Sequence, residues 1–152
     1  MTAPDDVRTF RVEVGGGRML EVRAAGPADG IPLIAHHGTP SIGLPFGPYV
    51  ATAASRGLQL VTATRPGYAG STRDPGRTVA SCAADTAAVA DAVGAERFYV
   101  TGQSGGGPHA LACAALLPDR VISAACIGTP APYGAEGLDW LDGMGEGNIV
   151  EF

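Results

Sequence analysis

The pattern of hydrophobic and polar positions along this chain predicts short strands that alternate with helices. Residues 9–14 and 19–25 alternate well enough for two strands, and the glycine run at 15–17 joins them as a hairpin. Three later runs are apolar without alternation, which is typical of strands buried on both faces. These runs are residues 31–35, 58–63 and 98–101. A further strand is expected over residues 121–127.

Helices are expected between these strands. The sequence predicts them around 49–55, over 78–93 and over 108–117. Glycines follow the first two, and Pro108 lies in the first turn of the third, where its missing N–H costs nothing. Strands that alternate with helices in this order predict an α/β fold of about six strands, in which a mostly parallel sheet is flanked by helices.

The composition agrees with a globular fold and excludes several functions. The chain has 152 residues, of which 45% are hydrophobic and 16% are charged. Its net charge of −5 argues against a nucleic-acid partner, which requires clustered positive charge. Because the chain contains no lysine, it cannot form a Walker A phosphate loop or a lysine Schiff base. No window is long and apolar enough to predict a membrane span.

The cysteines and the N-terminus favour a cytoplasmic location. The number of cysteines is odd and no C-x-x-C occurs, so we expect small buried thiols and no disulfide framework. The three are Cys82, Cys113 and Cys126. The first six residues carry acids where a signal peptide needs basic residues and an apolar run. Neither a metal nor a cofactor is expected.

The segment Gly102-Gln103-Ser104-Gly105-Gly106 matches the pattern G-x-S-x-G. It directly follows a buried strand and opens a helix, which is the setting that forces a serine onto a strained corner with its hydroxyl exposed. Glycine is needed on either side because a side chain there would collide with the neighbouring strand or helix. The free N–H groups of the following helix also favour negative charge at this position. Ser104 is therefore the candidate nucleophile.

Two other interpretations of this glycine-rich segment exist. It is a structural strand-to-helix turn if Ser104 has no chemical role. A dinucleotide-binding turn would need the spacing G-x-G-x-x-G, but Ser104 stands where the second glycine is required. The spacing therefore disfavours a dinucleotide cofactor, whereas the structural turn stays open.

With these residues in view, the chain resembles the α/β-hydrolase superfamily. The resemblance covers residues 9–130 and rests on four segments that occur in the family's order. They are the hairpin, the loop His37-Gly38-Thr39-Pro40, the loop Arg65-Pro66-Gly67-Tyr68-Ala69-Gly70-Ser71 and the serine turn. The resemblance implies a hydrolase in which Ser104 is the nucleophile. Relatives with an aspartate nucleophile, such as dehalogenases and epoxide hydrolases, are disfavoured because position 104 is serine.

The resemblance also implies an oxyanion hole made by the backbone N–H groups of Thr39 and Gly105. The position of Thr39 fits independently, since ligands of parallel sheets bind beyond the carboxyl ends of the strands. The remaining residues of the site are expected to be structural, with the His37 ring bracing its loop. These structural residues are His37, Gly38, Gly102 and Gly106.

The base and the acid that a serine nucleophile requires are missing from their expected places. The resemblance puts both after the serine, with the histidine last, but no histidine follows residue 109. His109 is a weak substitute, because five residues of helix displace it from Ser104 by about 7–8 Å. His36 is expected simply to end a strand. Acids after the last strand are Glu136, Asp139 and Asp142, whereas Asp85 and Asp91 are expected to be solvated or to cap a helix.

The C-terminal part of the chain suggests the first half of a longer hydrolase. Residues 1–137 fit the N-terminal part of the core, and residues 138–152 resemble the beginning of a lid. The strand at 121–127 is too apolar for an exposed sheet edge. We therefore expect a serine hydrolase that acts on ester, amide or related acyl bonds of a small molecule, with little or no activity in this chain alone. The alternative is a non-catalytic protein that pairs through this edge with a second copy or a complementing half.

Overall fold

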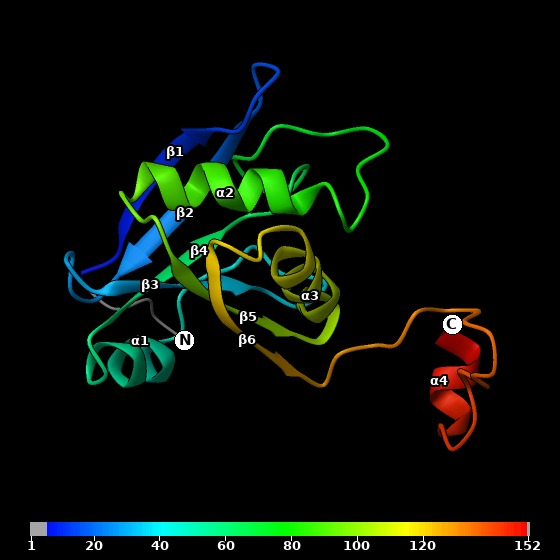
Figure 1. Ribbon diagram of the computed structural model, residues 1–152. Coiled ribbons are helices and arrows are strands. Elements are labelled where there is room, and N and C mark those ends of the chain that lie inside the picture. Colours follow the sequence, from blue (N-terminus) through cyan, green and yellow to red (C-terminus); the bar gives the residue numbers. More distant parts are fainter. Residues whose placement is uncertain (1–5, 152) are drawn as a thin grey trace.

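A computed structural model describes residues 6–151 and contains one six-stranded sheet (Figure 1). The strands are β1 (Arg8–Glu13), β2 (Met19–Ala25), β3 (Ile31–His36), β4 (Leu58–Ala63), β5 (Phe98–Gln103) and β6 (Val121–Ile127). Their order in the sheet is β1-β2-β4-β3-β5-β6. The hairpin β1–β2 joins β4 in antiparallel fashion, and β4, β3, β5 and β6 are parallel. The mostly parallel α/β fold expected from the sequence is confirmed.

Helices lie on both faces of this sheet. They are α1 (Gly47–Ala54), α2 (Cys82–Ala92) and α3 (Gly107–Leu116), and a short helix α4 (Glu146–Glu151) follows the sheet. The second helix is shorter at its start than the sequence predicts. Thr78 and Ser81 explain this difference, because each side-chain oxygen accepts the other residue's backbone N–H at 3.1 Å. This reciprocal pair closes a separate turn, and the helix begins immediately after it.

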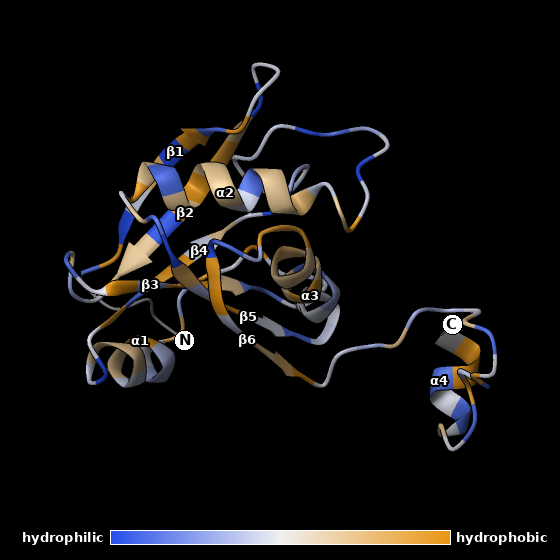
Figure 2. Cartoon of the chain, in the orientation of Figure 1, coloured by the Kyte–Doolittle hydropathy of each residue, from blue (hydrophilic) through white to orange (hydrophobic). Residues whose placement is uncertain are grey.

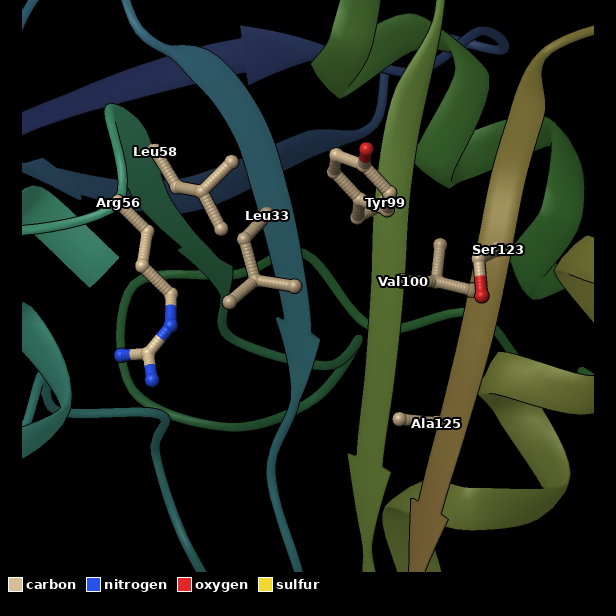
Figure 3. Close-up of a pocket in the computed structure, with 7 residues that line it drawn as sticks. All are labelled: Leu33, Arg56, Leu58, Tyr99, Val100, Ser123 and Ala125. Carbon is tan, nitrogen blue, oxygen red and sulfur yellow. The ribbon is translucent and has the colours of Figure 1, made fainter. Parts of the chain in front are cut away.

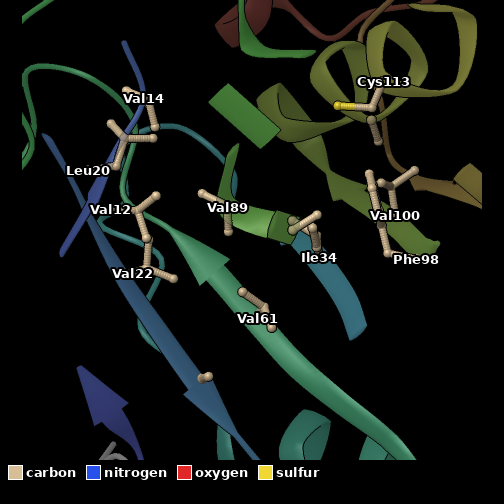
Figure 4. Packing of buried hydrophobic residues seen from close by; sticks show 13 residues of the cluster. Val12, Val14, Leu20, Val22, Ile34, Val61, Val89, Phe98, Val100 and Cys113 are labelled. Atoms are coloured by element: carbon tan, nitrogen blue, oxygen red, sulfur yellow. The ribbon is translucent and has the colours of Figure 1, made fainter. Parts of the chain in front are cut away.

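The larger core lies between the sheet and the pair α2 and α3 (Figure 4). Alternate residues of the strands point into it, so that Ile34, Val61, Phe98 and Val100 are almost completely buried. A smaller core on the opposite face packs α1 against β4. Because α1 covers only this part of the sheet, no helix within residues 6–151 lies over the same face of β5 and β6 (Figure 1).

Asp85 is buried, which corrects the expectation that it is solvated or caps a helix. Its side chain is bound by Arg18, whose Nη2 lies 2.7 Å from the carboxylate, while Asp74 flanks the same guanidinium at 3.6 Å. The charge of the buried carboxylate is therefore paired across 67 residues of sequence. Asp91 does stay exposed, where it binds Arg120.

Cys126 is exposed, which corrects the expectation of three buried thiols. Cys113 is buried and Cys82 is half-buried, as their apolar surroundings suggest. Cys126 differs because it belongs to β6, the last strand of the sheet. Residues 123–127 are all exposed although the strand is largely apolar (Figure 2), and Ile127 retains 55% of its accessible surface.

The chain after β6 extends away from the sheet and ends in α4 (Figure 1). Within this segment Trp140 stacks edge-on against Tyr133 at 5.4 Å, and its indole N–H donates to the Ala131 carbonyl. Between residues 6 and 151, no helix has both the length and the apolar character needed to cross a membrane.

Candidate active site

Ser104 stands at a sharp corner between β5 and α3. Its φ of +49° lies in the left-handed region, which is uncommon for any residue other than glycine. The residue is exposed, and a single turn of 3₁₀ helix over Ser104–Gly106 connects it to the helix. The structure thus places this serine on a strained backbone with its side chain accessible.

The glycines around Ser104 leave no room for side chains. A Cβ on Gly102 would lie 2.4 Å from the Gly106 carbonyl oxygen, and a Cβ on Gly106 would lie 2.0 Å from the carbonyl oxygen of His36. Both distances are far below van der Waals contact. The turn after β5 therefore presses directly on the end of β3.

This close approach brings the loop after β3 next to the serine. A Cβ on Gly38 would lie 3.5 Å from the Cβ of Ser104, and one on Gly105 would lie 3.6 Å from the backbone nitrogen of Thr39. Thr39 is exposed and is followed by a cis peptide bond to Pro40. The two backbone N–H groups of the expected oxyanion hole, at Thr39 and Gly105, thus belong to adjacent segments at the same end of the sheet.

The side chain of Arg65 holds this loop in place. Its guanidinium donates to the carbonyl oxygens of His37 and Gly38, the latter at 2.8 Å, and to Thr39 Oγ1 at 2.8 Å. Only 7% of Arg65 is exposed. One rigid fork of donors therefore binds three consecutive residues of the loop, a geometry that lysine could not reproduce.

His37 braces the loop from the other side. Its Nδ1 donates to the Gly38 carbonyl at 3.0 Å, and its Nε2 accepts the backbone N–H of Arg65 at 3.4 Å. Burial lowers the pKa of His37 to about 4. With both ring nitrogens bound to the backbone, this imidazole is neutral and has no free lone pair for a substrate proton.

His109 lies in the core beneath the serine turn. Its ring centre is 6.0 Å from that of His36, it is 7% exposed, and its Nδ1 has no hydrogen-bond partner. Burial lowers the pKa of His109 to about 4. Among the described residues, no histidine forms a hydrogen bond with Ser104.

The candidate acids lie elsewhere. Glu136, Asp139 and Asp142 are all exposed and belong to the segment that extends away from the sheet after β6. Asp139 uses one carboxylate oxygen to accept the backbone N–H of Leu141 at 3.3 Å. The structure therefore assembles the serine and its neighbouring amides, and within residues 6–151 it brings none of these three acids to a histidine.

A groove of about 420 Å³ runs along the uncovered face of the sheet beside α1. It reaches His37, Gly38 and Gln103, and also Ile127, which is the register partner of Gln103 on β6, but Ser104 does not line it. A second hollow continues it along the sheet, where Leu33, Tyr99 and Ala125 come from three neighbouring strands (Figure 3). The groove therefore belongs to the sheet face and not to the serine.

A comparison with known protein families identifies the family to which this fold belongs. The model of the alpha/beta hydrolase fold family matches residues 31–147, which is more than half of the chain. The chain belongs to the α/β-hydrolase fold family. The match includes the Arg65 loop, the serine turn and the loop at 37–40.

Solved structures show the same fold. An epoxide hydrolase from Vigna radiata superposes with a TM-score of 0.71 at 18% identity, over 87% of this chain and 41% of its own. A thioesterase domain from the curacin biosynthetic pathway gives 0.73 at 18% identity, over 84% and 48%. A proline iminopeptidase from Mycobacterium smegmatis gives 0.65 at 28% identity, over 82% and 44%. The chain spans less than half the length of each of these proteins.

The contribution of Arg65 is absent from the sequence-based expectations. The sequence does place Arg65 in a loop typical of the family, directly after a buried strand, and that position was the available signal. A charged residue that follows a buried strand at the carboxyl edge of a parallel sheet lies close to the loop that follows the neighbouring strand.

We expect Arg65→Lys to lower the free energy of unfolding by about 1–3 kcal/mol, because a single ammonium leaves buried acceptors of the loop unpaired. Arg11→Lys is the matched control, since Arg11 is exposed and makes one bond, to the Gly70 carbonyl at 3.2 Å. Urea denaturation measures both, and hydrogen exchange of residues 37–40 reports on the loop. Equal stability of the two variants would contradict the role of Arg65.

Stability should also fall between pH 6.5, the ordinary pKa of histidine, and pH values near 4, because His37 and His109 are neutral in the folded state. The unfolded chain takes up protons first as the pH drops, which favours unfolding. After allowance for solvent screening, we expect a loss of about 2 kcal/mol for the two residues between pH 7 and pH 5. Urea denaturation at both pH values measures it. His109→Gln should remove part of this dependence, and a flat profile in the parent chain would be inconsistent with it.

Proposed function

We propose that this chain carries the nucleophilic part of a serine hydrolase that acts on ester, amide or related acyl bonds. The observation that supports the proposal most strongly is the exposed, left-handed Ser104 beside the backbone nitrogens of Thr39 and Gly105. A merely structural turn would not need a residue with a Cβ at this strained position, since glycine adopts a positive φ without steric strain.

In the proposed reaction, Ser104 Oγ attacks the carbonyl carbon of the substrate and gives its proton to a base. The carbonyl oxygen becomes an oxyanion, which accepts hydrogen bonds from the N–H groups of Thr39 and Gly105. The intermediate collapses to an acyl-serine as the alcohol, thiol or amine leaves with a proton. Water then attacks the acyl group in the reverse sequence and releases a carboxylic acid and free Ser104.

Turnover by this chain alone should be slow, because residues 6–151 bring no base to Ser104. His37 is bound on both nitrogens and His109 is buried beneath the turn. Oxyanion stabilisation and binding alone leave about 10³–10⁴-fold acceleration over water in a protease stripped of its triad. We therefore propose that the base and the acid come from outside residues 6–151. This chain covers less than half of each of the three similar solved structures named above.

Acyl substrates agree better with the site than epoxides do. A serine oxygen forms an acyl-serine, the kind of intermediate through which acyl bonds are hydrolysed. The proline iminopeptidase, which is 28% identical, is named for the cleavage of an acyl bond. The thioesterase domain and the epoxide hydrolase are each only 18% identical, so their likeness reflects the fold.

Labelling with a fluorophosphonate tests the role of Ser104. We expect slow labelling at a single residue, Ser104, since strain and the oxyanion groups favour this serine even without a base. Ser104→Ala should abolish the labelling, whereas Ser123→Ala, which changes an exposed serine on β6, should leave it unchanged. Mass spectrometry of the peptides identifies the site. Labelling spread over several serines, with Ser104 unmodified, would exclude the nucleophilic role.

The exposed edge favours a second candidate function, in which the chain pairs with a second copy or a complementing half. The supporting observation is that β6 ends the sheet with apolar residues exposed, next to the groove that lies beside α1 on the same face of the sheet. Unpaired strand edges of this kind readily add another strand. Such pairing is compatible with the hydrolase proposal if the added part supplies the base.

Light scattering coupled to size-exclusion chromatography tests the pairing. We expect a concentration-dependent mass above that of the 15.3 kDa monomer. Ile127→Lys places a charge at the exposed end of β6 and should shift the protein toward the monomer, whereas Leu116→Lys, exposed at the end of α3, should not. A monomer at all concentrations would argue against self-association, and a complementing half would then have to be a different chain.

A further inference from the structure

Two thiols from different helices meet beneath the serine turn. Cys82 is the first residue of α2, and its Sγ donates to the carbonyl of His109, one turn before Cys113 on α3. The Thr86 hydroxyl donates to the Cys82 carbonyl at 2.8 Å and lies 3.4 Å from Cys113 Sγ. These contacts join the two cysteines through one small network at the interface of α2 and α3.

An imidazole adjoins this pair. His36, at the end of β3, places its Nε2 3.5 Å from Cys113 Sγ. The two thiols also interact with each other, which lowers the pKa of Cys113 and raises the pKa of Cys82. The arrangement thus favours a thiolate on Cys113, with the proton kept on Cys82 and an imidazole nitrogen 3.5 Å from the Cys113 sulfur.

Cys82 is the less buried of the two cysteines. Cys113 has no exposed surface, whereas Cys82 is half-buried. Cys82 and His36 both line a cavity of about 30 Å³, together with Thr86 and Arg65. Such a volume accommodates a molecule about the size of water. Within residues 6–151, no group of three or more histidine, cysteine, aspartate or glutamate side chains is placed to hold a metal ion.

We propose that Cys82 and Cys113 form a reversible disulfide when the protein meets a hydroperoxide. This oxidation does not involve Ser104 and goes beyond the proposed hydrolase activity. It makes α2 and α3 a covalently linked pair under oxidising conditions and a non-covalent one under reducing conditions.

The electrons and protons balance in two steps. In the first step, Cys113 releases its proton to His36. The Cys113 thiolate then accepts the proton of Cys82, while Cys82 Sγ attacks one oxygen of hydrogen peroxide. The O–O bond breaks, Cys82 becomes a sulfenic acid, and the departing hydroxide takes the proton from His36 and leaves as water. Cys113 Sγ then attacks the Cys82 sulfur, the S–O bond breaks, and a second water carries away the Cys113 proton. Two thiols are oxidised by two electrons while one peroxide is reduced to two waters.

Formation of the disulfide would change the surroundings of His36, the last residue of β3, which lies next to the candidate active site. The disulfide removes the thiol that adjoins the ring of His36, whose own carbonyl oxygen presses on Gly106 of the serine turn. His37 follows immediately and begins the loop that Arg65 holds. Cys113 therefore contacts His36, the residue whose backbone adjoins the serine turn and directly precedes the loop that contains Thr39.

The test uses the chain with Cys126→Ser, which removes the exposed thiol on β6 and prevents disulfides between molecules. The folded protein is treated with hydrogen peroxide and then alkylated after denaturation. We expect Cys82 and Cys113 to lose their reactivity together, with a mass decrease of about 2 Da for the two hydrogens that leave. Dithiothreitol should restore both thiols, and peptide mapping should find the bond between residues 82 and 113.

Cys82→Ser and Cys113→Ser in the same background are the matched controls. Each keeps one thiol and cannot form the internal bond, so we expect its oxidation to be about tenfold slower and to add oxygen to the protein. His36→Asn should slow disulfide formation to a similar degree if His36 accepts the proton. Thermal melts followed by circular dichroism confirm that each variant is folded.

Addition of oxygen to either thiol of the parent without a bond between them would overturn the proposal, as would independent reaction rates at the two cysteines. Ser104→Ala should form the disulfide at the unchanged rate. The outcome is therefore separate from that of the fluorophosphonate experiment, and either proposal can fail without the other.

Discussion

The contact between the end of β3 and the turn after β5 is the constraint on which the candidate site depends. The backbones meet so closely at His36 and Gly106 that no side chain fits between them. The parallel pairing of β3 with β5 extends to the partners His36 and Gly102, so the two loops leave the sheet at the same level. A serine on one loop and an amide on the other are thereby neighbours, although 65 residues separate Thr39 from Ser104 in the sequence.

The polar contacts around this point supplement the packing. Arg65 follows the adjacent strand β4 and binds the loop that follows β3. The carboxyl ends of β4, β3 and β5, which are neighbours in the sheet, therefore all contribute to the candidate site. Buried carbonyl groups without partners are costly, and here a charged donor satisfies them in a place where regular sheet hydrogen bonds have ended. His37 completes the pattern with both of its ring nitrogens. Packing sets the distance between the loops, while Arg65 and His37 determine the conformation of one of them.

The fold and the serine turn could be predicted because their signals are local. Apolar runs with glycines after them define strands and helix ends, and the steric reason for glycine at 102 and 106 follows from the strand-to-helix geometry alone. The roles of Arg65 and Asp85 could not be predicted, because each depends on a partner distant in sequence and on the rotamer of a long side chain. The exposure of Cys126 was missed for a different reason. An apolar strand resembles a buried one, and its pattern does not reveal whether another strand lies beyond it.

The order of strands in the sheet also has a consequence for folding. The central strand β3 lies between β4 and β5, both of which follow it in the chain. During synthesis β3 therefore leaves the ribosome before either of its neighbours exists, and its apolar residues wait for partners that are made later. Every pairing of β3 is non-local, a property associated with slow folding. The loop at residues 37–40 can become a neighbour of Ser104 only once β5 has paired with β3, so the candidate site cannot be complete before this pairing forms.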